Sequence, residues 1–260
     1  MVSKGGQDLH VQPLIHKPTV SANADSAWDD EVAASPAPAP SAAAHEVADV
    51  GILNERAAAI AQMDWVQLQA AVAQCTACAL CKGRKQAVFG VGDQQAQWLL
   101  VGEGPGRTED AQGEPFVGKS GKLLDNMLAS LGLKRGQNVY IANIVKCRPS
   151  DASGNDRPPS AEEASACRPF LERQIALLQP KLMLALGKTA AVSLLQRDPQ
   201  TAVASLRGRV QQVQMRNALA ENIAMPVVVT YHPAYLLRKP GDKAKAWADL
   251  CLAQQQYAQA

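Results

Sequence analysis

The chain has 260 residues with nearly balanced charge, 26 Lys and Arg against 24 Asp and Glu, and 47% of its residues are apolar. This composition supports one hydrophobic core and excludes a membrane span, because no apolar run is long enough. The first residues also lack the apolar segment of a secretory signal. We therefore expect a cytoplasmic location, where six cysteines favour metal or redox chemistry over disulfides.

The charges are unevenly distributed along the chain. Residues 1–60 hold eight acidic and three basic side chains, so the excess of bases falls in residues 61–260. Residues 33–44 are Ala, Pro and Ser alone, a composition that cannot offset its ordering entropy by burial. We predict a disordered acidic leader over residues 1–50 and a globular domain over residues 51–260. The basic charge of that domain is compatible with a polyanionic partner.

The domain alternates apolar runs typical of strands with helical apolar spacing. In chain order the pattern predicts a helix at 64–74, a strand at 98–101, a helix at 121–131, a strand at 139–145, a helix at 160–178, a strand at 182–186, a helix at 188–195, a strand at 227–231 and a helix at 242–257. Two of these helices begin with capping boxes, Asp64 with Gln67 and Ser160 with Glu163. The alternation predicts an α/β fold, a three-layer α/β/α sandwich with a central four-stranded parallel sheet.

Polar features follow three of the predicted strands. Glu103 lies in GEGPG after the first strand, Asn143 lies near the end of the second, and His232 directly follows the fourth. Sites in parallel sheets collect at the carboxyl ends of strands. His232 is the one histidine outside the leader. It fits either a structural residue or a hydrogen-bond donor to a developing anion.

The cysteines suggest a metal site. Cys75, Cys78 and Cys81 form C-x2-C-x2-C, and Cys147 and Cys167 follow at a wide spacing. Four thiolates hold either zinc or an iron–sulfur cluster, and the unequal spacing suits the cluster better. The sixth cysteine, Cys251, lies between two leucines on a predicted helix, so we expect it to be a small buried residue.

Residues 113–120, GEPFVGKS, match the Walker A pattern of nucleotide-binding loops. A phosphate-binding loop needs a strand directly before it, whereas RTEDAQ before Gly113 is polar and loop-like. Pro115 also removes a backbone N–H from the supposed phosphate cradle. We therefore predict that this segment binds no nucleotide cofactor.

Three ordered segments together resemble one known family. The segments are VGEGPGRTEDAQGEPFVGKSGKLLDNML from residue 101, VYIANIVKCRP from residue 139 and YHPAYLL from residue 231. They resemble the family 4 (iron–sulfur) uracil-DNA glycosylases, and the resemblance runs from about Cys75 to the C-terminus. It implies a four-stranded parallel sheet between helices, in agreement with the predicted elements. It also accounts for the Walker match, because the PFVG loop of the family is followed here by Lys-Ser.

The resemblance implies roles for nine residues. Cys75, Cys78, Cys147 and Cys167 would hold a structural [4Fe–4S] cluster, Glu103 and Gly104 would stand in the water-activating loop, Phe116 would stack on the extruded uracil, Asn143 would read its polar edge and His232 would support the leaving base. Two departures from the family pattern concern the cluster. The spacing from Cys147 to Cys167 is longer than usual, and Cys81 is a further thiol that could replace Cys78 or Cys75 as a ligand. The segment after the Asn motif, RPSDASGNDRPP, has no histidine, which disfavours the covalent uracil capture of a related branch.

The implied function is excision of uracil from DNA in base-excision repair, with the protein acting as a monomer. Tyr235, Leu236 and Leu237 beside Arg238 and Lys239 fit an apolar wedge flanked by phosphate contacts, or simply the start of a helix. The leader is either a tether or a segment that binds a replication or repair protein. The alternative function is a non-catalytic iron–sulfur DNA-binding or damage-sensing protein.

Overall fold

The computed structural model describes residues 55–216 and 221–259 of the chain. The predicted leader lies outside the described residues, and its role stays a prediction. The chain divides into two units, Met1–Ala42 and Ala43–Ala260, and the described residues all fall in the second. Over these residues, the structure contains no helix with the length and apolarity to cross a membrane.

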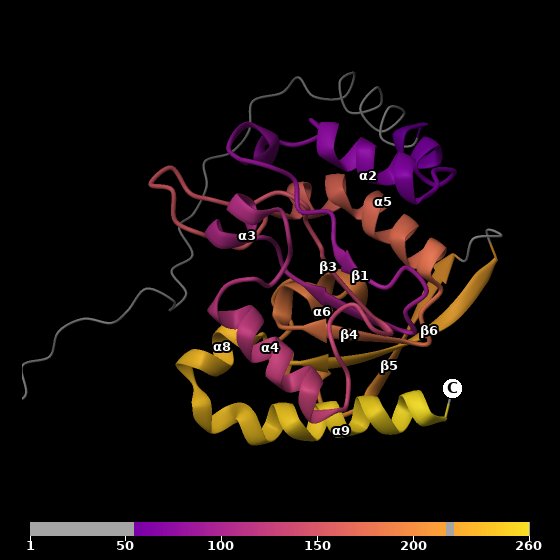
Figure 1. Cartoon of the computed structure of the whole chain (residues 1–260), viewed down its shortest axis with the longest axis vertical. Helices are drawn as coiled ribbons and strands as arrows, with labels where there is room; N and C mark the ends of the chain where they lie inside the picture. The colour runs from indigo at the N-terminus through magenta and orange to yellow at the C-terminus, as the bar shows by residue number, and fades with distance from the viewer. Residues whose placement is uncertain (1–54, 217–220, 260) are drawn as a thin grey trace, which may run out of the picture. The chain divides into compact units, whose positions relative to one another are not determined.

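Helices and strands alternate as the sequence predicts (Figure 1). A helical segment at residues 55–60 comes first. The elements are then α2 (Trp65–Gln74), the 3-10 helix η1 (Ala79–Lys82), β1 (Val91–Gly92), β2 (Trp98–Gly102), α3 (Arg107–Gln112), α4 (Lys119–Ser130), β3 (Val139–Asn143), α5 (Ala161–Leu178), β4 (Leu182–Leu186), α6 (Lys188–Leu194), α7 (Val203–Leu206), β5 (Val210–Arg216), β6 (Asn222–Thr230), α8 (Pro233–Arg238), η2 (Pro240–Asp242) and α9 (Lys243–Ala258). Both predicted capping boxes are confirmed, at the starts of α2 and α5.

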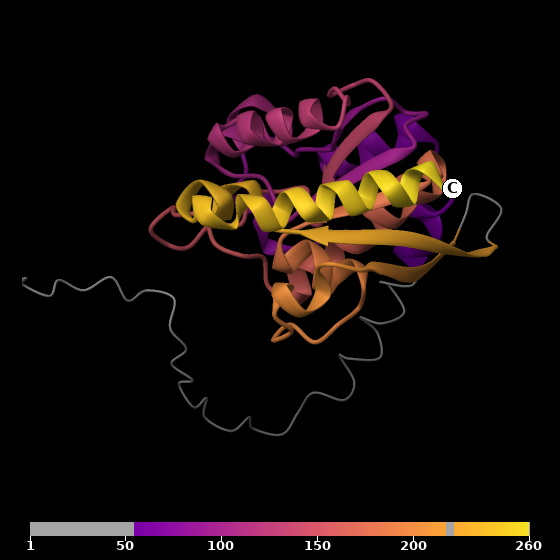
Figure 2. The same ribbon diagram turned by 90° about the horizontal axis from the view of Figure 1, so that it is seen from below.

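The sheet has six strands in the order β1-β3-β2-β4-β6-β5. The four central strands run parallel, as predicted, and pair in register, with Gly102 opposite Asn143 and Leu186 opposite Thr230. The two edge strands, β1 and β5, were not predicted, and they pair antiparallel to their neighbours. Figure 2 shows β5 and β6 as a long antiparallel pair with α9 beside them.

The central strands are buried on both faces, which is why they appear in the sequence as continuous apolar runs. One face packs under α2, α5, α6 and α7, and the other under α4, α8 and α9 (Figure 1). Alternate strand residues therefore belong to different cores: Leu99 and Val101 face α5, whereas Trp98 and Leu100 face α4 and α9. The three-layer prediction is confirmed.

Candidate active site and cysteine pocket

Residues from separate segments of the chain meet at the carboxyl edge of the parallel sheet. Glu103 follows β2, Asn143 closes β3, and His232 follows β6. The register of β2 and β3 places Gly102 directly beside Asn143. Gly104, one residue beyond Glu103, lies against Val145, since a Cβ there would be 2.8 Å from Val145 Cγ2.

Asn143 presents a buried acceptor at this edge. Asn143 is 2% exposed. Its Oδ1 has no hydrogen-bond partner in the part of the chain that the structure describes. A Cβ added to Gly102 would lie 2.4 Å from Asn143 Oδ1 and 2.5 Å from Phe116 Cζ. The amide and the aromatic ring therefore converge over the same glycine. An unpaired buried oxygen is costly, and a ligand that donates to it would remove that cost.

The backbone of Phe116 is held in an unfavourable conformation. Its φ of 56° lies in the left-handed region, which costs energy for an aromatic residue. Arg135 stabilises it by donating to the carbonyl oxygens of Pro115 at 2.9 Å and Phe116 at 2.8 Å. Asp125 in turn holds Arg135 through an ion pair of 3.0 Å. The ring of Phe116 is thus fixed against the site.

The loop that carries Phe116 is also fixed by Glu109 of α3. Glu109 Oε1 accepts from the backbone N–H groups of Val117 and Gly118, each at 3.0 Å. A carboxylate at the N-terminus of α4 also interacts favourably with the helix dipole. The charge of Glu109 acts to raise the pKa of His232. Burial of the imidazole acts in the opposite direction and outweighs it.

Glu103 pairs with the first turn of α6. Thr189 Oγ1 donates a hydrogen bond to Glu103 Oε2. Burial raises the pKa of Glu103, and the hydrogen bond from Thr189 opposes that rise. The carboxylate is thereby held in one orientation in a poorly hydrated position.

The imidazole of His232 lies beside Phe116, with 5.5 Å between the ring centroids and 32° between the planes. Its Nδ1 accepts from the backbone N–H of Ala234 at 3.1 Å, capping α8. Burial, aided by the charge of Arg238, lowers the pKa of His232 to about 4. The neutral ring therefore carries its proton on Nε2, which leaves one donor for a ligand.

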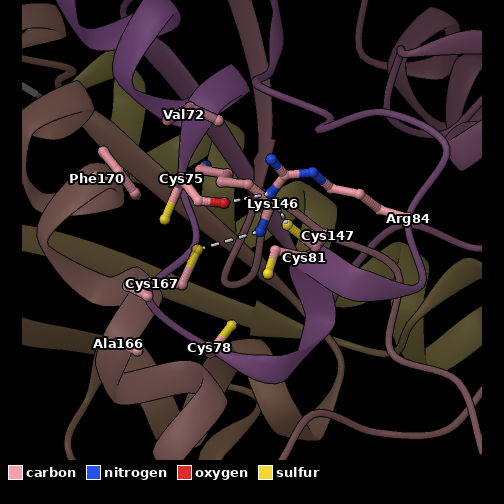
Figure 3. Close-up of a pocket in the computed structure, with 11 residues that line it drawn as sticks. Val72, Cys75, Cys78, Cys81, Arg84, Lys146, Cys147, Ala166, Cys167 and Phe170 are labelled. Carbon is pink, nitrogen blue, oxygen red and sulfur yellow. Dashed lines mark hydrogen bonds between the residues drawn. The ribbon is translucent and has the colours of Figure 1, made fainter.

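Five cysteines line one pocket on the α5 side of the sheet (Figure 3). They are Cys75, Cys78, Cys81, Cys147 and Cys167. The sulfur atoms come from the end of α2, from η1, from the loop after β3 and from α5, and Figure 3 shows them turned toward a common space. Cys147 and Cys167 are buried, whereas the other three are half-buried. Burial raises the pKa of Cys147, and that of Cys167 to about 11.

Basic groups face the sulfur atoms. Arg84 Nη1 donates to Cys147 Sγ at 3.0 Å, and Arg56 Nη2 approaches Cys75 Sγ at 3.6 Å. The backbone N–H of Lys146 donates to Cys167 Sγ at 3.2 Å. Positive charge and N–H donors around thiol sulfurs favour their deprotonated, metal-binding form.

The five thiols do not form a site for a single metal ion in the described residues. No group of three or more His, Cys, Asp or Glu side chains among residues 55–216 and 221–259 is arranged around a single metal ion. A cluster with one iron per cysteine needs a wider arrangement than one zinc ion does.

The expectation for Cys251 was wrong. It is exposed, because α9 buries Leu250 and Ala253, and Cys251 points away from that face.

Sequence reasoning missed Thr189, Glu109 and Arg135. Thr189 follows β4 after Gly187 and Lys188, so the rule that flagged the other strand ends could have found it. Glu109 and Arg135 act on the backbone of the Phe116 loop, and nothing in their local pattern marks such contacts.

The Walker-like segment has no preceding strand. Residues 107–112 form α3, which corrects their interpretation as a loop, and Gly113 ends that helix with a φ of 80°. Because a helix precedes Gly113, the strand–loop–helix order of a phosphate-binding loop is not present at this position.

The chain matches the family model described as Uracil DNA glycosylase superfamily over residues 89–251. It is 38% identical over 192 residues to the type-4 uracil-DNA glycosylase of Pyrobaculum aerophilum, covering 73% of this chain and 93% of that protein. It is 40% identical to the type-4 uracil-DNA glycosylase of Archaeoglobus fulgidus over 171 residues, covering 65% of this chain and 81% of that protein. The type-4 uracil-DNA glycosylase of Thermotoga maritima is 38% identical over 174 residues, with 67% and 83% covered.

The site at the sheet edge and these matches together define a class. The chain belongs to the uracil-DNA glycosylase superfamily, and within it to the type-4 uracil-DNA glycosylases.

Proposed function

We propose that this protein extrudes uracil from DNA and hydrolyses its N-glycosidic bond, leaving an abasic site for base-excision repair. The observation that carries the proposal is the buried, unpaired Oδ1 of Asn143 beside the Phe116 ring. Membership of the type-4 family supports the same activity. We further propose that the protein is a monomer and acts in the cytoplasm.

Recognition of uracil falls to Asn143 and Phe116. The amide Oδ1 accepts from uracil N3–H and the amide nitrogen donates to O4, whereas cytosine presents the reverse pattern. The Phe116 ring offers a stacking face, worth about 1–3 kcal/mol for a nucleic-acid base. That gain offsets part of the few kcal/mol needed to unstack the nucleotide.

Cleavage of the glycosidic bond leaves an anionic base and a cationic sugar. The Nε2–H of His232 would donate to the uracil oxygen that gains negative charge, so the ring acts as a neutral donor throughout. Glu103, oriented by Thr189, would hold the attacking water and favour the developing cation. The absence of a side chain at Gly104 lets the loop after Glu103 pack against the side chains of Val145 and Pro149.

The DNA contact is proposed at the end of α8. The helix-start interpretation holds for Leu236, which is 1% exposed in the core, and this residue is therefore no wedge. Leu237 is 46% exposed and precedes Arg238 and Lys239. We assign to Leu237 the role of the wedge that fills the gap in the base stack. Arg238 and Lys239 would contact the phosphates beside it.

The cysteine pocket fits a [4Fe–4S] cluster held by Cys75, Cys78, Cys147 and Cys167. Its thiol donors suit iron, the facing Arg56 and Arg84 offset part of the negative charge of four thiolates, and the backbone N–H of Lys146 donates to Cys167 Sγ. When bound, the cluster would supply a structural cross-link between the α2–η1 segment, the loop after β3 and α5. Glycosidic hydrolysis transfers no electron, so the chain's own residues carry out the reaction.

The test is excision from a uracil-containing oligonucleotide under single-turnover conditions, followed by alkaline cleavage of abasic sites. Wild type should release uracil, and Glu103→Ala and His232→Ala should lose most of that rate while staying folded. If wild type binds the oligonucleotide and never cleaves it, the protein is instead a non-catalytic DNA-binding or damage-sensing protein.

A further inference from the structure

The ammonium group of Lys146 is buried between the base-recognition site and the cysteine pocket, and none of the steps proposed above uses it. The residue is 1% exposed. Its Nζ donates to the backbone carbonyl of Asn143 at 2.9 Å and to Gln174 Oε1 of α5 at 2.6 Å. Long charged side chains are almost never buried this completely without a specific set of partners.

The side chain of Gln174 and the backbone of Lys146 are themselves held by further hydrogen bonds. Gln174 is fully buried, and its Nε2 donates to the carbonyl of Phe89 at 3.0 Å. The backbone carbonyl of Lys146 accepts from Val88 N–H at 2.7 Å. The backbone N–H of Lys146 donates to Cys167 Sγ, a contact drawn in Figure 3. Both ends of the Lys146 side chain are therefore anchored to α5.

Asn143 is the last residue of β3. The peptide group that follows it is held from two sides: its N–H, that of Ile144, donates to Gly102 O at 2.9 Å, and its carbonyl oxygen, that of Asn143, accepts from Lys146 Nζ. The orientation of that carbonyl fixes the peptide plane after Asn143, and with it the direction in which the side-chain amide leaves the backbone.

From this geometry we infer that Lys146 is a positioning residue for uracil recognition, which holds Asn143 in register through its hydrogen bonds to the Asn143 carbonyl and Gln174. The inference rests on the proposed function. It gives this buried cation a role in base selection in addition to its place beside the cysteines.

The test compares Lys146→Met with wild type on two duplexes, one with uracil and one with a tetrahydrofuran abasic analogue that has no base. Misplacing Asn143 should lower the single-turnover excision rate by roughly 10- to 100-fold. It should also weaken binding of the uracil duplex while leaving binding of the analogue unchanged. The iron content should match that of wild type.

Two further variants separate positioning from stability. The double variant Lys146→Met with Gln174→Leu leaves no unpaired Gln174 Oε1, but it also takes the Gln174 donor away from the carbonyl of Phe89. Its excision rate should stay as low as that of Lys146→Met, whatever its thermal stability. Arg173→Met is the control variant. Arg173 is a neighbouring basic residue of α5 whose Nε donates to the carbonyl of Met63, away from the site, so this variant should excise uracil as wild type does.

Unchanged excision by Lys146→Met, or an equal loss of binding to both duplexes, would overturn the role of Lys146 while the glycosylase assignment stands. A double variant that recovered the excision rate along with its stability would overturn it as well. An inactive wild type would overturn both.

Discussion

A Cβ on Gly121 would lie 1.7 Å from the carbonyl oxygen of Phe116, so the first turn of α4 admits the Phe116 loop only because residue 121 is glycine. This close approach adds to the two hydrogen bonds by which Arg135 holds the strained backbone of Phe116.

We expect Gly121→Ala to displace Phe116 and to lower the excision rate at least about tenfold, because the stacking ring moves away from Asn143. Gly132→Ala is the matched control. Gly132 has a φ of 72° with open space around it, so alanine there should cost about 1 kcal/mol of stability without changing the rate. Thermal unfolding measures the stability of each variant, and single-turnover excision measures its rate. A wild-type rate in Gly121→Ala would contradict the expectation.

His232 should titrate far below an ordinary histidine. Its pKa of about 4 lies below the usual 6.5, so the unfolded chain takes up the proton first as the pH falls. The free energy of unfolding should therefore decline as the pH falls from 6.5 to 4, while the folded protein keeps His232 as a neutral donor down to about pH 4. A variant with His10, His16 and His45 changed to Gln leaves one imidazole for NMR titration. A midpoint near 6.5, or a proton on Nδ1, would contradict the assignment.

The hydrogen bond from Thr189 should tune Glu103. Because this bond lowers the pKa of a carboxyl that burial raises, Thr189→Val should raise that pKa further. In the proposed mechanism the carboxylate is the active form, so the acid limb of the pH–rate profile should move to higher pH. Thr189→Ser keeps the hydroxyl and should keep the wild-type profile. An unmoved acid limb in Thr189→Val would show that Glu103 does not control it.

Removing a proposed ligand should remove the cluster. Cys147→Ser and Cys167→Ser should lower iron content, visible absorbance and thermal stability together, because both buried thiols join separate segments. Cys251→Ser changes an exposed thiol on α9 and should alter none of these. Cys81→Ser should keep its iron. Loss of iron in Cys81→Ser would instead place Cys81 in the ligand set.

The central sheet was predictable because its strands are buried on both faces and therefore appear as short continuous apolar runs. The edge strands were not. β1 has two residues, and β5 alternates buried Gln211, Val213 and Met215 with exposed Gln212 and Gln214, where glutamine hides the period. The rule that sites in parallel sheets collect at the carboxyl ends of strands likewise predicted the positions of Glu103, Asn143 and His232.

Contacts that depend on tertiary structure were beyond the sequence. The hydrogen bonds of Arg135 and Lys146 end on backbone carbonyls, and a carbonyl is present at every position, so no residue pattern identifies it as a partner. The positive φ of Phe116 is equally hidden, because the stabilising contacts come from other segments.

The distribution of the site over the parallel strands has a consequence for folding. Parallel strands pair only after long crossovers close, and β6, the last central strand in the chain, delivers His232. No fragment that ends before β6 can hold the complete site. Uracil release during refolding should therefore lag behind the appearance of helical signal, and would time the docking of the final strand.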